Sequence, residues 1–102
     1  MPSIEGSQVR KLVIACDAGM GSSVLMANQL KKRLKDNGVT IEHSPIYAIP
    51  ADADLVLTHT KLADRTRAHA GDRPVVAFSA FIGDPAVDGV VAAIHGGTTI
   101  DG

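Results

Sequence analysis

Short apolar runs alternate with longer stretches of helical periodicity along this chain. Val13-Ile14-Ala15 lies within a predicted strand over residues 10–15, and consecutive apolar residues are typical of a strand buried on both faces. Further strands are predicted over residues 39–43, 54–58 and 74–78. The first of these three alternates apolar and polar residues, which indicates an edge strand with one exposed side.

Three helices are predicted, two between strands and one after the last strand. Met26, Leu30 and Leu34 recur at helical spacing and form one apolar stripe. The first predicted helix is capped by Ser22 or Ser23 and ends at Asn37-Gly38. The second covers residues 61–70. The third begins at Asp84-Pro85 and ends at residues 95–97.

Strands and helices that alternate in this way imply right-handed parallel crossovers. We expect a three-layer α/β domain over residues 10–97, with a four-stranded parallel sheet of order 2-1-3-4 and helices on both faces. Residues 1–9 are expected to be a leader or linker with little regular structure, and residues 98–102 a tail. Between Pro45 and Pro50, a short connector should pack Ile46, Tyr47 and Ile49 beneath the sheet.

Composition narrows the classes of protein that fit. The 102 residues suffice for one domain, and an apolar share of 45% with only 3% aromatics predicts an aliphatic core. A net charge of −1 argues against non-specific nucleic-acid binding, and one cysteine cannot form an internal disulfide. The N-terminus lacks the pattern of a signal peptide, and no apolar run approaches the ~20 residues of a membrane span, so we expect a cytoplasmic domain without membrane insertion.

The candidate chemistry lies where the first predicted strand leads into the first helix. The sequence there is Cys16-Asp17-Ala18-Gly19-Met20-Gly21-Ser22-Ser23. Backbone N–H groups in such a turn, together with the helix N-terminus, favour a bound anion. The same groups stabilise a thiolate, so we interpret Cys16 as a reactive cysteine that carries a phosphoryl group, and not as a small buried core residue.

Three better-known phosphate loops do not fit. A dinucleotide-binding fingerprint needs a glycine where Val24 stands, and a Walker loop needs a lysine that is absent. A cysteine phosphatase loop needs an arginine six residues after the cysteine, where this chain has Ser22. Without that guanidinium, the loop is less suited to phosphoryl transfer to water, and a loop that releases phosphate only to a docked partner fits better.

Two further polar residues follow strand ends at the same predicted edge. His59 follows the third strand and Ser79 the fourth, and ligands of such sheets bind beyond the carboxyl ends of the strands. On residue type alone, His59 could equally be a surface histidine. The four histidines share no metal-ligand spacing, so no metal site and no cofactor are predicted.

The loop resembles the phosphocysteine loop of the mannitol-type enzyme IIB component of the bacterial sugar phosphotransferase system. A second stretch, Asp52-Ala53-Asp54-Leu55-Val56-Leu57-Thr58-His59 with Leu62 and Arg65 following, is similar to the third strand and next helix of that family. The resemblance covers roughly residues 10–94. The galactitol- and ascorbate-type IIB domains have a similar architecture, but Asp-Ala directly after the cysteine looks most like the mannitol branch.

The resemblance implies a phosphotransferase. Cys16 would accept a phosphoryl group from a phosphohistidine of enzyme IIA and pass it to a sugar held by the membrane-embedded IIC component. The cradle for that group would be Asp17, Ala18, Gly19, Met20, Gly21, Ser22 and Ser23. Two alternatives stay open: a cysteine phosphatase or arsenate-reductase-like enzyme, and a IIB-like regulatory module.

Overall fold

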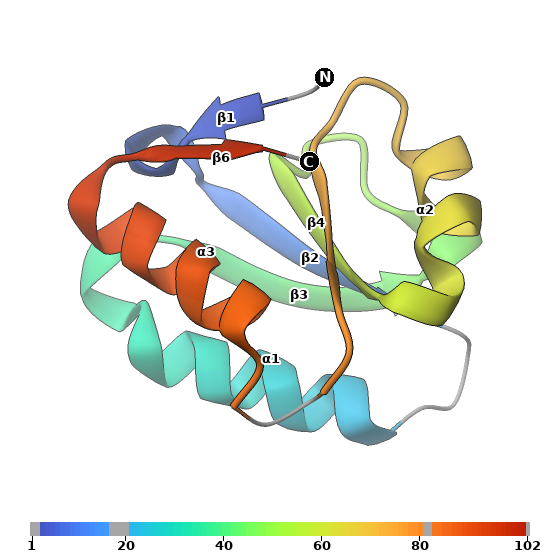
Figure 1. The fold of residues 1–102 in the computed structure, drawn as a ribbon, viewed down its shortest axis with the longest axis horizontal. Helices are drawn as coiled ribbons and strands as arrows, with labels where there is room; N and C mark the ends of the chain where they lie inside the picture. The colour runs from blue at the N-terminus through green and yellow to red at the C-terminus, as the bar shows by residue number, and fades with distance from the viewer. Residues whose placement is uncertain (1–2, 17–20, 81–82, 102) are drawn as a thin grey trace.

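The computed structural model describes residues 3–16, 21–80 and 83–101 of the chain (Figure 1). Within these ranges, a central sheet is covered by helices on both faces. The strands are β1 (Ser3–Glu5), β2 (Lys11–Cys16), β3 (Thr40–Pro45), β4 (Leu55–His59), β5 (Val75–Phe78) and β6 (Thr99–Asp101). The α-helices are α1 (Gly21–Arg33), α2 (Ala63–Ala70) and α3 (Pro85–Gly96).

The central sheet has four parallel strands in the order β3-β2-β4-β5. These are the second, first, third and fourth of the strands predicted from the sequence, so the predicted order is confirmed. Leu12 of β2 pairs with Ile41 of β3 on one side and with Leu55 of β4 on the other. The alternating strand β3 lies at the edge, as its pattern indicated.

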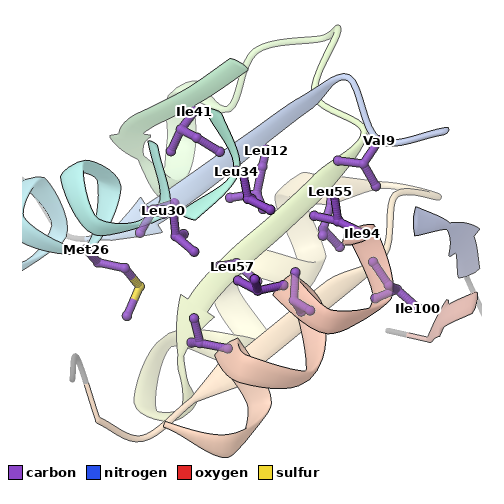
Figure 2. Packing of buried hydrophobic residues seen from close by; sticks show 14 of the residues in the cluster. Val9, Leu12, Met26, Leu30, Leu34, Ile41, Leu55, Leu57, Ile94 and Ile100 are labelled. Carbon is purple, nitrogen blue, oxygen red and sulfur yellow. The ribbon is translucent and has the colours of Figure 1, made fainter. Parts of the chain in front are cut away.

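Period-two alternation divides the apolar side chains of the sheet between two cores. On one face, Leu12 and Ile14 of β2 and Leu55 and Leu57 of β4 pack against α1 and α3 (Figure 2). Met26, Leu30 and Leu34 all belong to this core, which confirms the predicted apolar stripe. Each of these seven side chains is at most 1% exposed, and each buried aliphatic side chain stabilises the fold by roughly 1.5–3 kcal/mol.

The opposite face carries a smaller core beneath α2. Val13 and Ala15 of β2 and Val56 of β4 contribute to it, and Ala70 of α2 covers them. Ile46, in a 3-10 helix over Ile46–Ala48, is 3% exposed and belongs to this core as predicted. Tyr47 does not, because its side chain is 74% exposed, so its predicted burial was wrong.

Most of the helix ends lie where the capping residues predicted them. Gly38 takes the left-handed conformation (φ 69°) after α1 and a 3-10 turn over Lys35–Asn37, and Asp84 caps α3 with Pro85 in the first turn. The start of α1 differs from the prediction. The helix begins at Gly21, so Ser22 and Ser23 lie inside its first turn and not at the N-cap position.

The expected leader and tail form regular structure. β1 and β6 pair antiparallel in a two-stranded sheet, with Ile4 opposite Ile100. Ile100 is 5% exposed and joins the core under α3. Gly6, in the 3-10 turn that follows β1, donates its N–H to the carbonyl of Thr98 at 2.7 Å. The two ends of the chain are therefore packed against α3.

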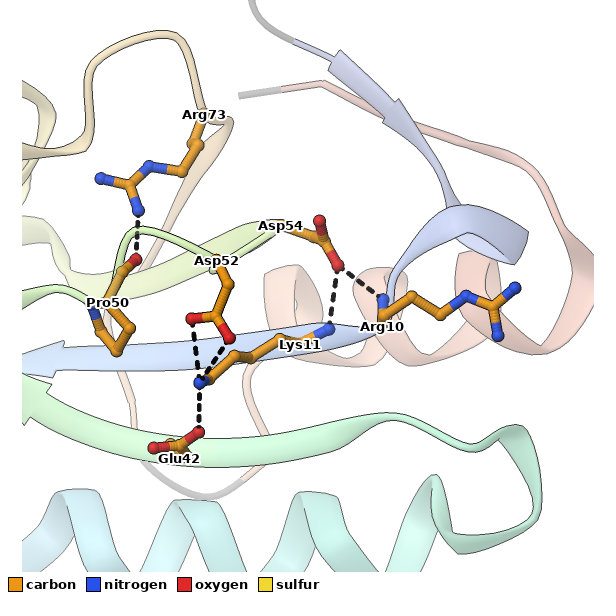
Figure 3. A network of polar contacts seen from close by, with 7 residues as sticks. All are labelled: Arg10, Lys11, Glu42, Pro50, Asp52, Asp54 and Arg73. Atoms are coloured by element: carbon orange, nitrogen blue, oxygen red, sulfur yellow. Dashed lines mark hydrogen bonds and ion pairs between the residues drawn. The ribbon is translucent and has the colours of Figure 1, made fainter.

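A polar network closes the amino-terminal edge of the sheet (Figure 3). Lys11 Nζ lies 2.6 Å from Glu42 Oε2 and 3.0 Å from Asp52 Oδ1, and hydrogen bonds from these two carboxylates raise the pKa of Lys11. Asp54 Oδ2 accepts the backbone N–H groups of Arg10 and Lys11 at 2.8 and 3.0 Å. These groups fix the loop before β4 at the end of β2 opposite Cys16.

Candidate functional site

The carboxyl ends of β2 and β4 meet at one edge of the sheet, and α1 begins at that edge. β2 ends at Cys16, β4 ends at His59, and Gly21 begins α1. Parallel strands that connect through helices place helix N-termini at the carboxyl edge, where ligands of such sheets bind. Cys16 and His59 are thus brought to one edge, whereas Asp17, Ala18, Gly19 and Met20 lie outside the described residues.

Cys16 is held in the strand and not in a loop. It pairs with Pro45 of β3, and the residue is 8% exposed with a free thiol. Because Leu12 and Ile14 face the core beneath α1 and α3, alternation places Cys16 on that same face. The thirteen-residue helix α1 begins at the same edge of the sheet, and its N-terminus gives that edge partial positive charge.

His59 lies beside Cys16 in the register of the sheet. Ala15 pairs with Thr58, so Cys16 and His59 are the next residues along β2 and β4. His59 also pairs with Phe78 of β5, and the two rings make an edge-to-face contact with centroids 5.9 Å apart. Phe78 belongs to the core beneath α3, so the three side chains form a row on one face.

Hydrogen bonds on both faces of the sheet fix the surroundings of His59. The N–H of Lys61 donates to His59 Nδ1 at 3.1 Å, at the start of a 3-10 helix over Thr60–Leu62. On the other face, the Thr66 hydroxyl donates to the Leu62 carbonyl at 2.8 Å and lies 2.9 Å from the Thr58 hydroxyl. Both threonines are fully buried, and their contact ties β4 to α2 directly below His59.

Ser79 is bonded to the cap of α3. Its backbone N–H and its hydroxyl both donate to Asp84 Oδ2, at 2.8 and 3.2 Å, and the N–H of Ala80 donates to the same oxygen. Asp84 Oδ1 accepts the N–H of Ala86. Burial alone would raise the pKa of Asp84, but the donated hydrogen bonds lower it to about 2. The geometry therefore gives Ser79 a structural partner; a role toward the ligand stays a prediction.

The cap formed by Asp84 should make the free energy of unfolding of this domain depend on pH in the acid range. Its pKa is lower in the folded state than in the unfolded chain, so its stabilising effect is complete above about pH 4 and is lost as the pH falls toward about 2. Asp84→Ala should lower the free energy of unfolding by about 2 kcal/mol at neutral pH. Urea unfolding of the wild type and of Asp84→Ala between about pH 2 and pH 7 measures this effect. The difference in free energy of unfolding between the two proteins should shrink as the pH falls. A constant difference would contradict it.

Three large apolar side chains are exposed among the described residues. Val24 and Leu25, in the second turn of α1, are 42% and 48% exposed, and Tyr47 follows β3 two residues after the partner of Cys16. All three follow segments that end at the carboxyl edge. Sequence reasoning missed them because helical periodicity does not show whether an apolar residue beside the buried stripe is exposed, and because Tyr47 was predicted to be buried.

Two other classes of site receive no support from the described part of the chain. Within residues 3–16, 21–80 and 83–101, no three His, Cys, Asp or Glu side chains are grouped to hold a metal ion. None of the helices described there has the length and apolarity needed to cross a membrane.

Known proteins resemble this chain over most of its length. The family model described as "PTS system, Lactose/Cellobiose specific IIB subunit" matches residues 11–93. The "PTS system mannitol-specific cryptic EIICB component" of Escherichia coli (strain K12) is 43% identical over 84 residues, which are 80% of this chain and 18% of that protein. The "PTS system mannitol-specific EIICBA component" of Vibrio cholerae is 38% identical over 81 residues, 78% of this chain and 12% of that protein.

A third relative is another component of the phosphotransferase system. The "PTS system mannitol-specific EIICB component" of Halalkalibacterium halodurans is 35% identical over 89 residues, 85% of this chain and 19% of that protein. The chain thus spans less than a fifth of the length of these relatives. The family match covers β2 through most of α3, which are the elements that form the site edge. The chain belongs to the IIB family of the phosphotransferase system.

Proposed function

We propose that this domain is the phosphoryl carrier between enzyme IIA and a sugar bound by the membrane component IIC. The observation that carries the proposal is the single cysteine at the carboxyl end of β2, followed by the glycine-containing sequence that leads into α1. Family membership supports the same role. Cys16 is the acceptor, with residues 17–23 as the cradle of the phosphoryl group.

Transfer would occur in two displacements at phosphorus. The Cys16 thiolate attacks the phosphohistidine of IIA in line, the S–P bond forms, and the N–P bond breaks with its electron pair returning to the imidazole. A sugar hydroxyl on IIC then attacks the phosphocysteine and passes its proton to water, while the S–P bond breaks with its electron pair returning to sulfur as the thiolate. The protein contributes positioning and stabilisation of the charge on the equatorial oxygens.

Mannitol is the proposed sugar. The names of the relatives support this choice, since all three are called mannitol-specific, whereas the family model is described by lactose and cellobiose. The domain would work in the cytoplasm, docking on IIC at the inner face of the membrane. Incubation of the phosphorylated domain with IIC vesicles should yield mannitol phosphate. Phosphorylation of galactitol instead would contradict the choice of sugar and leave the carrier role standing.

Reconstitution tests the carrier role. The domain is incubated with phosphoenolpyruvate, the general phosphotransferase proteins and mannitol-type IIA, and intact mass and peptide mapping follow. We expect one phosphoryl group on the peptide that contains Cys16. Labelling of a histidine, or no labelling, would overturn the proposal. Rapid turnover of an aryl phosphate without partner proteins would favour the phosphatase alternative.

The exposed apolar residues predict where IIA docks. Leu25→Ser and Tyr47→Ser should each slow transfer from limiting IIA by about tenfold, because large side chains at an interface contribute most of its binding energy. Stability should barely change, since both side chains are largely exposed. Lys32→Ser, an exposed change farther along α1, is the matched control. Equal rates for all variants would place the interface elsewhere without touching the assignment of Cys16.

A further inference from the structure

Nδ1 of His59 is already used as a hydrogen-bond acceptor. A backbone N–H can only donate, so the 3.1 Å contact from Lys61 N requires a lone pair on Nδ1. In the neutral ring, the proton must then be on Nε2. The 3-10 turn after β4 therefore fixes the tautomer of this histidine.

The strand register brings that ring to Cys16. His59 is one step beyond the Ala15–Thr58 pair, opposite Cys16, on the middle of three adjacent strands. Cys16, His59 and Phe78 share the face covered by α1 and α3, as the core membership of Ile14, Leu57 and Phe78 shows. Adjacent strands lie about 4.8 Å apart, so an imidazole on β4 is within reach of a group attached to the Cys16 sulfur.

Phe78 limits the directions in which the ring can turn. The edge-to-face contact, with an interplanar angle of 82°, packs His59 against a phenylalanine that is 2% exposed. Beneath the strand, the Thr58–Thr66 contact fixes the backbone from which His59 extends. A side chain held at its Nδ1 edge and against one ring face has few accessible rotamers, which is what a preorganised donor requires.

Resting on the carrier role proposed above, we propose that His59 binds the phosphoryl group on Cys16, with Nε2–H donating to a phosphoryl oxygen. The arginine that clamps phosphate in phosphatase loops has no counterpart at Ser22, and a single hydrogen-bond donor fits the carrier better. A hydrogen bond of this kind positions the group for in-line transfer and leaves it easier to release than a guanidinium pair would.

Two near-isosteric variants separate this role from a structural one. Asparagine can keep the acceptor for the Lys61 N–H but places no donor at the Nε2 position, whereas the amide nitrogen of glutamine reaches that position. We expect His59→Asn to slow phosphorylation of Cys16 at saturating IIA by about 10- to 100-fold, and His59→Gln to retain most of the rate. A purely structural role predicts the reverse order, and that result would overturn the inference.

A second test uses the wild-type domain, so it does not depend on whether a variant folds. Long-range ¹H–¹⁵N spectra of the His59 ring should show the Nε2–H tautomer before phosphorylation. Phosphorylation should move the Nε2 resonance more than the Nδ1 resonance. An Nδ1–H tautomer, or an unchanged Nε2 resonance in a domain labelled at Cys16, would overturn the inference. Absence of label at Cys16 would instead overturn the carrier role.

Discussion

Cys16→Ser is expected to abolish phosphoryl transfer through this domain, with a rate at least ~1,000-fold below that of the wild type. A serine hydroxyl has the shape of the thiol but is a much weaker nucleophile near neutral pH. Cys16 is buried at the end of β2, and the replacement changes the volume little, so the sheet should remain intact. The effect should therefore fall on the chemical step and not on the fold.

Intact mass after incubation with phosphoenolpyruvate and the donor proteins measures this prediction directly. Circular dichroism and the thermal midpoint of the variant provide the control for folding. A Cys16→Ser domain that still took up one phosphoryl group at the wild-type rate would show that another residue is the carrier. A variant that unfolds would be replaced by Cys16→Ala, for which the same loss is expected.

Gly6→Ala is expected to cause the largest loss of stability. A methyl group on Gly6 would lie 2.0 Å from the carbonyl oxygen of Ala93 and 2.9 Å from the Cα of Ile94, both in the backbone of α3. Backbone cannot move aside as a flexible side chain can, so relief requires the 3-10 turn to leave α3 and the bond to Thr98 to break. We expect a loss of about 3 kcal/mol, or roughly 15 °C in thermal midpoint.

Gly89→Ala is the matched control in α3 itself. A methyl group there meets no atom within 4 Å, and the residue is exposed in the middle of the helix. Alanine should stabilise the domain by about 0.5–1 kcal/mol, because glycine has the lower helix propensity. Opposite shifts for the two variants in thermal scans support the packing of the turn on α3. A Gly6→Ala domain whose thermal midpoint rose as that of Gly89→Ala does would show that packing of the N-terminal turn on α3 contributes no stability.

Local patterns were enough to predict the sheet. The run Val13-Ile14-Ala15 belongs to the centre of a parallel sheet, and β2 is indeed flanked by β3 and β4. Asn37-Gly38 and Asp84-Pro85 are signals that depend on one backbone conformation each, and both occur where they were predicted. Such features can be predicted because their causes lie within a few residues of one another.

Features that depend on distant partners could not be predicted in the same way. Ile4 and Ile100 each lie in three-residue strands, and neither strand has a recognisable period without the other. Tyr47 stands beside buried Ile46 in one turn, and its exposure depends on how that turn meets α2. The helix begins at Gly21, so neither Ser22 nor Ser23 is at the N-cap position that its residue type favours.

The site shows the same division. Cys16 and His59 could be placed at one edge from strand order alone. The tautomer of His59, however, depends on a 3-10 turn that no sequence motif predicts. Ser79 was correctly placed after a strand end, yet its bonds to Asp84 required the fold of the following loop. The roles of residues 17–23 stay predictions from the sequence.

The β1–β6 pair has a consequence for how the domain can be tethered. Ser3 pairs with Asp101, so polypeptide joined to either strand would leave from the same side of the domain, and Figure 1 shows β1 and β6 side by side. β1 leads through the turn at Gly6 into the amino-terminal end of β2, whereas Cys16 is at the carboxyl end of that strand. A tether attached at this pair would therefore leave the carboxyl edge, with Cys16 and His59, open to contact with other proteins.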